Sequence, residues 1–203
     1  MAAQTDKPRR VRVIGNSGAG KTTFARALAV RLGLPRAELD EIFWDANWTQ
    51  RPVEEGRTRL AAFLDGPGTA GWVVDGNWNS RVGDLLDSAD AIVWLDYSRW
   101  VVMSRVIWRT LSRLVSRREL WHGNRERPSH LFRRDPAENI ILWAWTQQPV
   151  YHAQYAELAQ HDSRVVRLAN PRAAQRWLAG VGCEVQSRSS WRTKSTKAAD
   201  LAS

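Results

Sequence analysis

The chain has 203 residues, 43% of them hydrophobic, which suits one globular domain with a full core. Its 30 basic and 21 acidic side chains give a formal net charge of +9, so we expect an anionic partner, either nucleic acid or phosphorylated small molecules. The composition excludes three features: a membrane-spanning run of ~20 apolar residues, a signal-peptide stretch and, with Cys183 as the single cysteine, an internal disulfide. We therefore expect a soluble, cytoplasmic protein with no membrane association.

Short apolar runs alternate with helical periodicity, which predicts an α/β fold with a mainly parallel sheet. Strands are expected at residues 10–14, 37–40, 72–76, 91–96 and 164–168, and helices at 20–32, 53–64, 99–118, 136–160 and 171–178. We divide the chain into an N-terminal extension (1–9), one domain (10–182) with an irregular lid at about 117–135, and a basic, disordered tail (183–203).

Two of the expected helices carry further signals. In the helix at 99–118, the buried face should hold Ile107, Leu111, Leu114 and Val115, and a basic stripe on another face should hold Arg105, Arg109, Arg113 and Arg117. For the helix that follows the lid, Asp135 is expected to be the N-cap, and Pro149 is expected to kink or break it.

A glycine-rich segment follows the first expected strand and opens the first helix. It fits G-x-x-x-x-G-K-[ST] at every fixed position, and the nucleotide-binding residues that it predicts are Gly15, Asn16, Ser17, Gly18, Ala19, Gly20, Lys21, Thr22 and Thr23. Glycines let backbone N–H groups surround an anion, and the helix directs its positive end at the same point. Lys21 is expected to reach the β- and γ-phosphates of ATP, and Thr22 to offer its hydroxyl to Mg²⁺.

Three carboxylates are each expected at the carboxyl end of a parallel strand, where open α/β sheets bind ligands. Asp75 is our first choice to hold Mg²⁺ through its water shell. Asp96 also ends a hydrophobic run, as Asp75 does, but we favour the role of a helix cap for it. Asp40 either contacts an acceptor hydroxyl and takes its proton or is a cap or turn residue.

The segments GNSGAGKTT, LDEIFW, WVVDGNW and ADAIVWLD, followed by an arginine-rich stretch, resemble the adenylate-kinase-like branch of P-loop kinases. Within it they are most similar to the bacterial group labelled DNA topology modulation proteins. The resemblance covers roughly residues 11–179. It implies a three-layer fold with a five-stranded parallel sheet, ATP·Mg²⁺ as the phosphoryl donor, and an arginine-rich lid. The family's acceptor specificity does not transfer, because Asn77 and Trp78 replace the Phe-Pro pair of adenylate kinases, and Arg81 comes later than their arginine.

The expected acceptor pocket lies beyond the second and third strands and comprises Asp40, Trp44, Trp48, Asn77, Trp78 and Arg81. Aromatic faces with a few polar groups suit a planar or sugar-like acceptor, although the same tryptophans could pack a loop against the core. In the lid, Arg117, Arg125 and Arg133 are our candidates for clamping phosphates. Asn170 and Arg172 follow the last strand, where related kinases contact adenine, or they simply start a helix.

These features predict an ATP-dependent phosphotransferase for a nucleotide, a nucleoside or a similar small acceptor. Two other functions stay open. The basic stripe suits a nucleic-acid-associated ATPase, and a phosphate loop alone suits a non-catalytic module that senses nucleotides. The sequence does not specify the oligomeric state.

Overall fold

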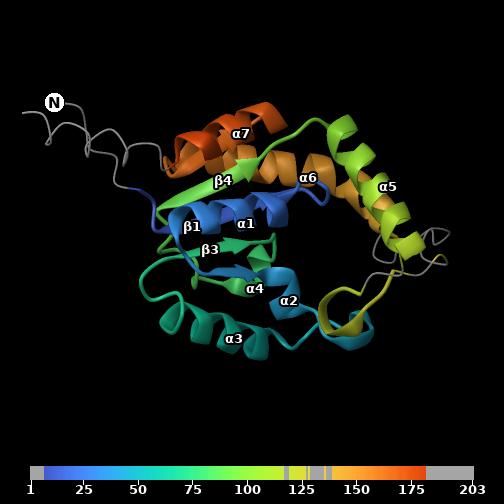
Figure 1. Ribbon diagram of the computed structural model, residues 1–203, viewed down its shortest axis with the longest axis horizontal. Coiled ribbons are helices and arrows are strands. Elements are labelled where there is room, and N and C mark those ends of the chain that lie inside the picture. Colours follow the sequence, from blue (N-terminus) through green and yellow to red (C-terminus); the bar gives the residue numbers. More distant parts are fainter. Residues whose placement is uncertain (1–6, 117–118, 127, 129–134, 136–138, 182–203) are drawn as a thin grey trace, which may run out of the picture.

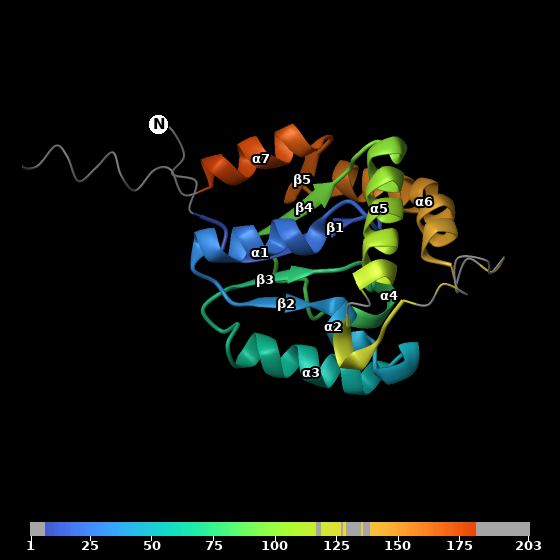
Figure 2. The same cartoon turned by 45° about the vertical axis from the view of Figure 1, so that its right-hand side comes forward.

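The computed structural model describes residues 7–116, 119–126, 128, 135 and 139–181. Its five parallel strands lie in the order β2-β3-β1-β4-β5 and span Arg36–Glu38, Trp72–Asp75, Arg10–Gly15, Ala91–Leu95 and Val165–Leu168. Helices cover both faces of this sheet (Figures 1 and 2). The predicted three-layer α/β fold with a five-stranded parallel sheet is therefore confirmed. The N-terminal segment 1–6, the segment 182–203 and much of the expected lid lie outside the described residues.

Two hydrophobic cores lie on opposite faces of the sheet. On one face α1 (Lys21–Leu32), α5 (Arg99–Ser116) and α7 (Pro171–Gly180) pack against the strands. On the other face lie α2 (Leu39–Phe43), α3 (Val53–Asp65), α4 (Asn79–Val82) and the C-terminal half of α6 (Ile140–His161). Side chains alternate between these cores along each strand, so the central strands are apolar at nearly every position. Among the described helices, none has both the length and the apolar character required to cross a bilayer.

The second strand is shorter than expected. β2 ends at Glu38, and the next residues form α2, so Asp40 is the second residue of a helix rather than the end of a strand. The predicted strand at 37–40 is wrong at its carboxyl end. Glu38, rather than Asp40, is the residue that pairs in register with Asp75 of β3.

The start of α6 also differs from the prediction. The helix begins at Ile140 and is capped by Asn139, whose side-chain oxygen accepts from the backbone N–H groups of Ile141 and Leu142 at 3.1 and 3.2 Å. Asp135 is therefore not the N-cap, because the residue directly before Ile140 satisfies the first free N–H groups.

Pro149 lies inside α6, and the helix continues through it, so the expected break is absent. A proline inside a helix leaves the carbonyl four residues earlier without its N–H donor. That carbonyl belongs to Trp145, and it accepts from Nη2 of Arg99 at 3.0 Å, while the guanidinium lies 3.9 Å from the centroid of the Trp145 ring. Arg99 thus supplies the donor that Pro149 lacks.

The orientation of α5 is opposite to the prediction. The residues that it buries are Val102, Met103, Val106 and Thr110, whereas Ile107, Leu111 and Val115 are exposed. The arginines at 105, 109 and 113 point toward the glycine-rich loop and the lid segment instead of lining the outer surface. The predicted buried face is therefore wrong for Ile107, Leu111 and Val115, while Leu114 is half-buried, and the interior face is formed by Val102, Met103, Val106 and Thr110.

Gly56 of α3 provides a test of this packing. A β-carbon at Gly56 would lie 2.3 Å from Cε1 of Phe43, a side chain that is fully buried and stacked on Trp78. Alanine normally stabilises a helix interior by about 1 kcal/mol relative to glycine. Because overpacking costs roughly 1–3 kcal/mol, we expect Gly56→Ala to lower the free energy of unfolding in urea titration.

Gly180, at the end of α7, is the matched control, since a β-carbon there would meet no atom within 4 Å. Gly180→Ala should be neutral or slightly stabilising. Equal effects of the two substitutions would contradict the described contact between α3 and Phe43.

Candidate active site

The glycine-rich loop, residues 15–20, connects β1 to α1 at the carboxyl edge of the sheet, and its backbone requires glycine at two positions. Gly18 has φ 84°, and a β-carbon there would lie 2.4 Å from Cγ2 of Val106, because α5 packs directly on the loop. Gly20 has φ 90° and is the N-cap of α1, with no side-chain cap. The first N–H groups of α1 therefore have no side-chain acceptor from the cap, which leaves them suited to an anion.

Lys21 is the first residue of α1, and its ammonium lies within the loop. Nζ donates to the carbonyl oxygens of Gly15 at 2.8 Å and Asn16 at 3.2 Å. Burial lowers the pKa of this ammonium, while the nearby carboxylates of Asp40 and Asp75 oppose the shift. A buried cation next to free N–H groups is a favourable site for phosphate.

Thr22 joins the loop helix to two strands. Its Oγ1 lies 3.0 Å from Oε1 of Glu38 and 2.9 Å from Oδ2 of Asp75, so it can donate its one proton to either carboxylate. Asp75 is 1% exposed and Glu38 is 8% exposed. The structure thus brings together the predicted pair Thr22 and Asp75 and adds a second acid, Glu38, that sequence reasoning missed.

Arg36 is the cation that partly compensates these acids. Its Nη1 lies 2.6 Å from Oδ1 of Asp75, and its guanidinium is 3.4 Å from Oε2 of Glu38. Even so, burial raises the pKa of both carboxyls; the neighbouring Asp75 raises that of Glu38 further, and Arg36 limits the rise for Asp75. Two buried carboxylates with one shared arginine leave this corner short of positive charge.

A magnesium ion fits the chemistry of this corner. Mg²⁺ prefers oxygen ligands and is usually held by one or two carboxylates together with substrate phosphates and waters. Thr22, Asp75 and Glu38 supply such oxygens next to the loop that would hold the phosphates. Within the part of the chain that the structure describes, no group of three His, Cys, Asp or Glu side chains forms a self-sufficient metal site. The ion would therefore arrive with the nucleotide.

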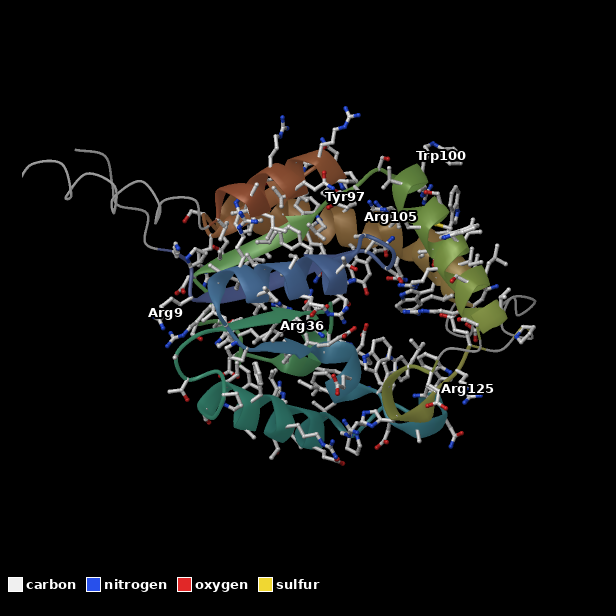
Figure 3. All side chains as sticks on the ribbon, viewed as in Figure 1. Arg9, Arg36, Tyr97, Trp100, Arg105 and Arg125 are labelled. Carbon is white, nitrogen blue, oxygen red and sulfur yellow. The ribbon has the colours of Figure 1, made fainter. Side chains whose placement is uncertain are left out.

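Two arginines of α5 complete the loop's surroundings. Arg105 donates to the Ala19 carbonyl at 3.2 Å, and Arg109 donates to Oγ of Ser17 at 3.3 Å; Figure 3 shows Arg105 between α5 and the loop. Nε of Arg109 is buried and has no hydrogen-bond partner among the described atoms. Burial and the neighbouring Arg113 lower the pKa of Arg109. An unsatisfied cationic donor beside the loop is a second indication that this site is suited to an anion.

Asp40 lies near the loop from the opposite side. Its Oδ1 accepts from the indole N–H of Trp78 at 2.7 Å, and its charge acts on the pKa values of Lys21, Arg109 and Tyr151. Asp40 thus lies close enough to Lys21, Arg109 and Tyr151 for its charge to act on each of them, and it also raises the pKa of Glu38.

The other predicted acceptor residues fall into two groups. Trp44, Trp48 and Trp78 form a chain of edge-to-face rings, with centroids 5.8 Å apart for Trp44–Trp48 and 5.4 Å for Trp44–Trp78. Asn77 instead binds both backbone groups of Gly15, accepting from its N–H at 3.3 Å and donating to its carbonyl at 2.9 Å. Arg81 lies 5.4 Å from the Trp78 ring centroid and donates to the Arg51 carbonyl at 2.9 Å.

The described part of the lid is docked on the acceptor side. Asn124 is buried, accepts from the Trp48 N–H and donates to the Asp45 carbonyl, both at 2.8 Å. A cavity of about 480 Å³ lies at this contact and is lined by Asn47, Trp48, Leu114, Gly123, Asn124, Arg125, Glu126 and Pro128. Of the three predicted lid arginines, Arg125 forms an exposed ion pair with Glu119. Arg117 and Arg133 lie outside the described residues.

Two residues beyond the last strands have structural roles. The side chain of Asn170 accepts from the Ala173 N–H at 2.9 Å and so caps α7. The cap predicted for Asp96 is wrong, because its carboxylate instead binds Nδ1 of His152 at 2.9 Å and Arg167 at 2.6 Å. These contacts with α6 and β5 direct the Asp96 carboxylate away from the start of α5.

The raised pKa of Glu38 leads to a test that combines stability and binding. A carboxyl whose folded pKa is raised stabilises the fold when protonated, and that contribution is lost as pH rises through its folded pKa. In Glu38→Gln, we therefore expect a free energy of unfolding above that of wild type at neutral pH, with the difference shrinking in acid. Mg²⁺-dependent nucleotide binding should weaken in the same variant.

Glu54→Gln is the control, since Glu54 is 84% exposed at its side chain and remote from the loop. It should show neither effect. A Glu38→Gln variant with unchanged pH dependence and unchanged Mg²⁺ response would remove Glu38 from the metal corner.

Comparisons with known proteins identify no family. No protein-family model matches the chain, and no curated protein matches it. Among solved structures it is similar to a shikimate kinase from Bacteroides thetaiotaomicron (TM-score 0.47, 16% identity, covering 85% of this chain and 95% of that one). It is also similar to a gluconokinase from Sinorhizobium meliloti 1021 (TM-score 0.46, 19% identity, 90% and 98% covered). TM-scores of this size establish no activity, so function is derived below from the site residues.

Proposed function

We propose that this protein is an ATP-dependent phosphotransferase that moves the γ-phosphoryl group of ATP·Mg²⁺ to a hydroxyl of a small acceptor. The observation that carries the proposal is the separation of its carboxylates. Glu38 and Asp75 contact Thr22 on the metal side of the loop, whereas Asp40 lies across from Lys21 and is bound by Trp78. A protein that only binds nucleotide needs the first group but has no use for the second.

The proposed roles follow from these positions. The loop N–H groups, Lys21 and Arg109 bind the phosphates and stabilise the charge that spreads over the transferring group. Asp40 accepts the proton of the acceptor hydroxyl while the oxygen of that hydroxyl forms a bond to the γ-phosphorus. The bond between the γ-phosphorus and the β–γ bridging oxygen then breaks and releases ADP. Mg²⁺, when held by Thr22, Asp75 and Glu38, would neutralise charge on the β- and γ-phosphates. The oriented indole N–H of Trp78 keeps Asp40 directed at the acceptor.

The described acceptor side favours recognition by aromatic surface. Its arginines are already engaged: the buried Arg51 with Asp45 and Glu55, and Arg81 with Gln50 and the Arg51 carbonyl. Trp44, Trp48 and Trp78 remain partly exposed. We therefore propose that the acceptor presents a planar or sugar-like uncharged part to the three tryptophans, as a nucleoside does.

Membership of the adenylate-kinase-like branch, and of its DNA topology modulation group in particular, is part of this proposal. It rests on the order of the sequence segments together with the loop and sheet described above. The nucleic-acid-associated ATPase loses its main support, because Arg105, Arg109 and Arg113 of the basic stripe contact Ala19, Ser17 and Glu126.

Lys21→Ala tests the donor side. We expect it to abolish phosphoryl transfer from labelled ATP in a screen of nucleosides, nucleoside monophosphates and small hydroxy compounds. Because Lys21 is a buried cation whose pKa is lowered by burial, the substitution should not lower the melting temperature of the free protein. Turnover at the wild-type rate would refute the assignment, and ATP binding by wild type without transfer to any acceptor would favour a sensing module.

Asp40→Asn tests the acceptor side. Removal of a general base typically costs 10²–10⁴-fold in rate, so we expect a loss of about that size in kcat with little change in the KM for ATP. Glu41→Gln, an exposed neighbour on α2, is the control and should retain full activity. A kcat equal to wild type in Asp40→Asn would mean that Asp40 only supports the Trp78 loop.

A further inference from the structure

The outer face of α5 is an apolar surface that no described residue covers. It consists of Trp100, Ser104, Ile107, Trp108, Leu111 and Val115, which we call the α5 seam. Trp100, Trp108 and Val115 are 79%, 75% and 88% exposed, and Ile107 and Leu111 are exposed as well. Figure 3 shows Trp100 on the outer side of this helix. None of the six residues carries a charge, which is unusual for the solvent face of a helix.

We infer that the α5 seam binds the same seam of a second copy of this chain, with the two helices antiparallel around a two-fold axis. The spacing of the seam supports this inference, because the steps between its residues are 4, 3, 1, 3 and 4, the same from either end. A two-fold axis places each residue of a helix opposite a different residue of its copy. In an antiparallel pair, each residue of the seam therefore lies opposite another residue of the seam on the second copy.

The sizes of the paired side chains are also complementary. Antiparallel pairing centred between Ile107 and Trp108 brings each of these residues opposite the other. Under the same pairing, Trp100 lies opposite Val115 of the second copy, and Ser104 lies opposite Leu111 of the second copy. Large side chains therefore face smaller ones at the outer positions, which allows the close packing that helix pairs require.

The area is sufficient for an interface. A buried tryptophan removes roughly 150–250 Å² from water, and Trp100 and Trp108 expose about three quarters of their surface, so these two side chains could bury roughly 200–400 Å² per copy. With Ile107, Leu111 and Val115 added, the total over both copies approaches the ~1,000 Å² above which an interface is credible. An apolar patch of this extent on a monomer is normally a binding surface.

The arrangement of the arginines favours a second copy over a lipid surface. Helices that lie on membranes place basic side chains where they can reach lipid headgroups. On α5, Arg105 and Arg109 donate to the glycine-rich loop, and Arg113 pairs with Glu126 at 2.9 Å. All three therefore have partners within this molecule, although Arg105 is exposed, and the seam itself is neutral.

Sedimentation velocity of the full chain over a wide concentration range tests the inference. We expect a concentration-dependent dimer for wild type and a monomer for Ile107→Asp and Trp108→Asp, with circular dichroism confirming that both variants are folded. Val30→Asp is the matched control, since Val30 is 79% exposed on α1, outside the seam, and it should remain dimeric. A wild-type monomer at every concentration, whether or not it binds anionic vesicles, would overturn the inference, as would a dimer unaffected by both seam substitutions.

Cysteine cross-linking tests the antiparallel register, in a Cys183→Ser background because Cys183 is the only native cysteine. A disulfide requires Cα atoms within about 7 Å. Antiparallel pairing separates the two copies of residue 104 by about 10 Å along the helix axis but brings residue 104 opposite residue 111. Mixing Ser104→Cys with Leu111→Cys should therefore give a cross-linked heterodimer, while either variant alone stays uncross-linked. Cross-linking of Ser104→Cys with itself would overturn the antiparallel arrangement.

Discussion

The in-register pairing of β2 with β3 is the constraint on which the site depends. It places Glu38 beside Asp75 at the carboxyl edge of the sheet, where both carboxylates are buried. Two neighbouring buried carboxylates need hydrogen-bond donors and positive charge. Thr22 of α1 provides a hydroxyl donor, and Arg36 of β2 provides a cation. The hydroxyl of Thr22 therefore fixes the start of α1 against the sheet, and with it the loop whose N–H groups face the phosphate. The residual negative charge is what suits the corner to a cation that comes with a nucleotide.

The same electrostatic demand explains why arginines of α5 lie on the side of the helix that meets the glycine-rich loop, next to the buried Val102 and Val106. A loop that binds several phosphates needs cations on the side away from Glu38 and Asp75, and Arg105 and Arg109 provide them. Helical geometry then moves the apolar residues at the complementary positions to the outside. If the loop binds phosphate as proposed, the exposure of the α5 seam follows from the cations that the loop needs. A second copy covering the seam would hold α5 against the loop from behind, so association and phosphate binding would stabilise the same helix.

The parts of the molecule that could be predicted from sequence are those set by local chemistry. The loop at residues 15–22 carries its own glycines, lysine and threonine, and four of the five strands were located within about one residue because buried parallel strands are continuously apolar. Longer-range effects could not be read in this way. The exposure of Ile107 depends on the packing of α5 on the glycine-rich loop, which lies far earlier in the chain. The continuity of α6 at Pro149 depends on Arg99 of α5. Periodicity distinguishes the faces of a helix but does not say which face meets the protein.

The end of β2 determines that the carboxylates of Glu38 and Asp40 lie in different surroundings. Residues two apart on a strand point to the same side of a sheet, so a strand continuing to Asp40 would have directed Asp40 and Glu38 to the same corner. Because α2 starts at Leu39, the chain turns between them. Glu38 stays beside Thr22 and Asp75, and Asp40 is carried to Trp78, where the indole N–H fixes its orientation. In the proposed reaction, Glu38 would help to hold the metal while Asp40 would accept the proton of an acceptor hydroxyl, and phosphoryl transfer needs both of these roles.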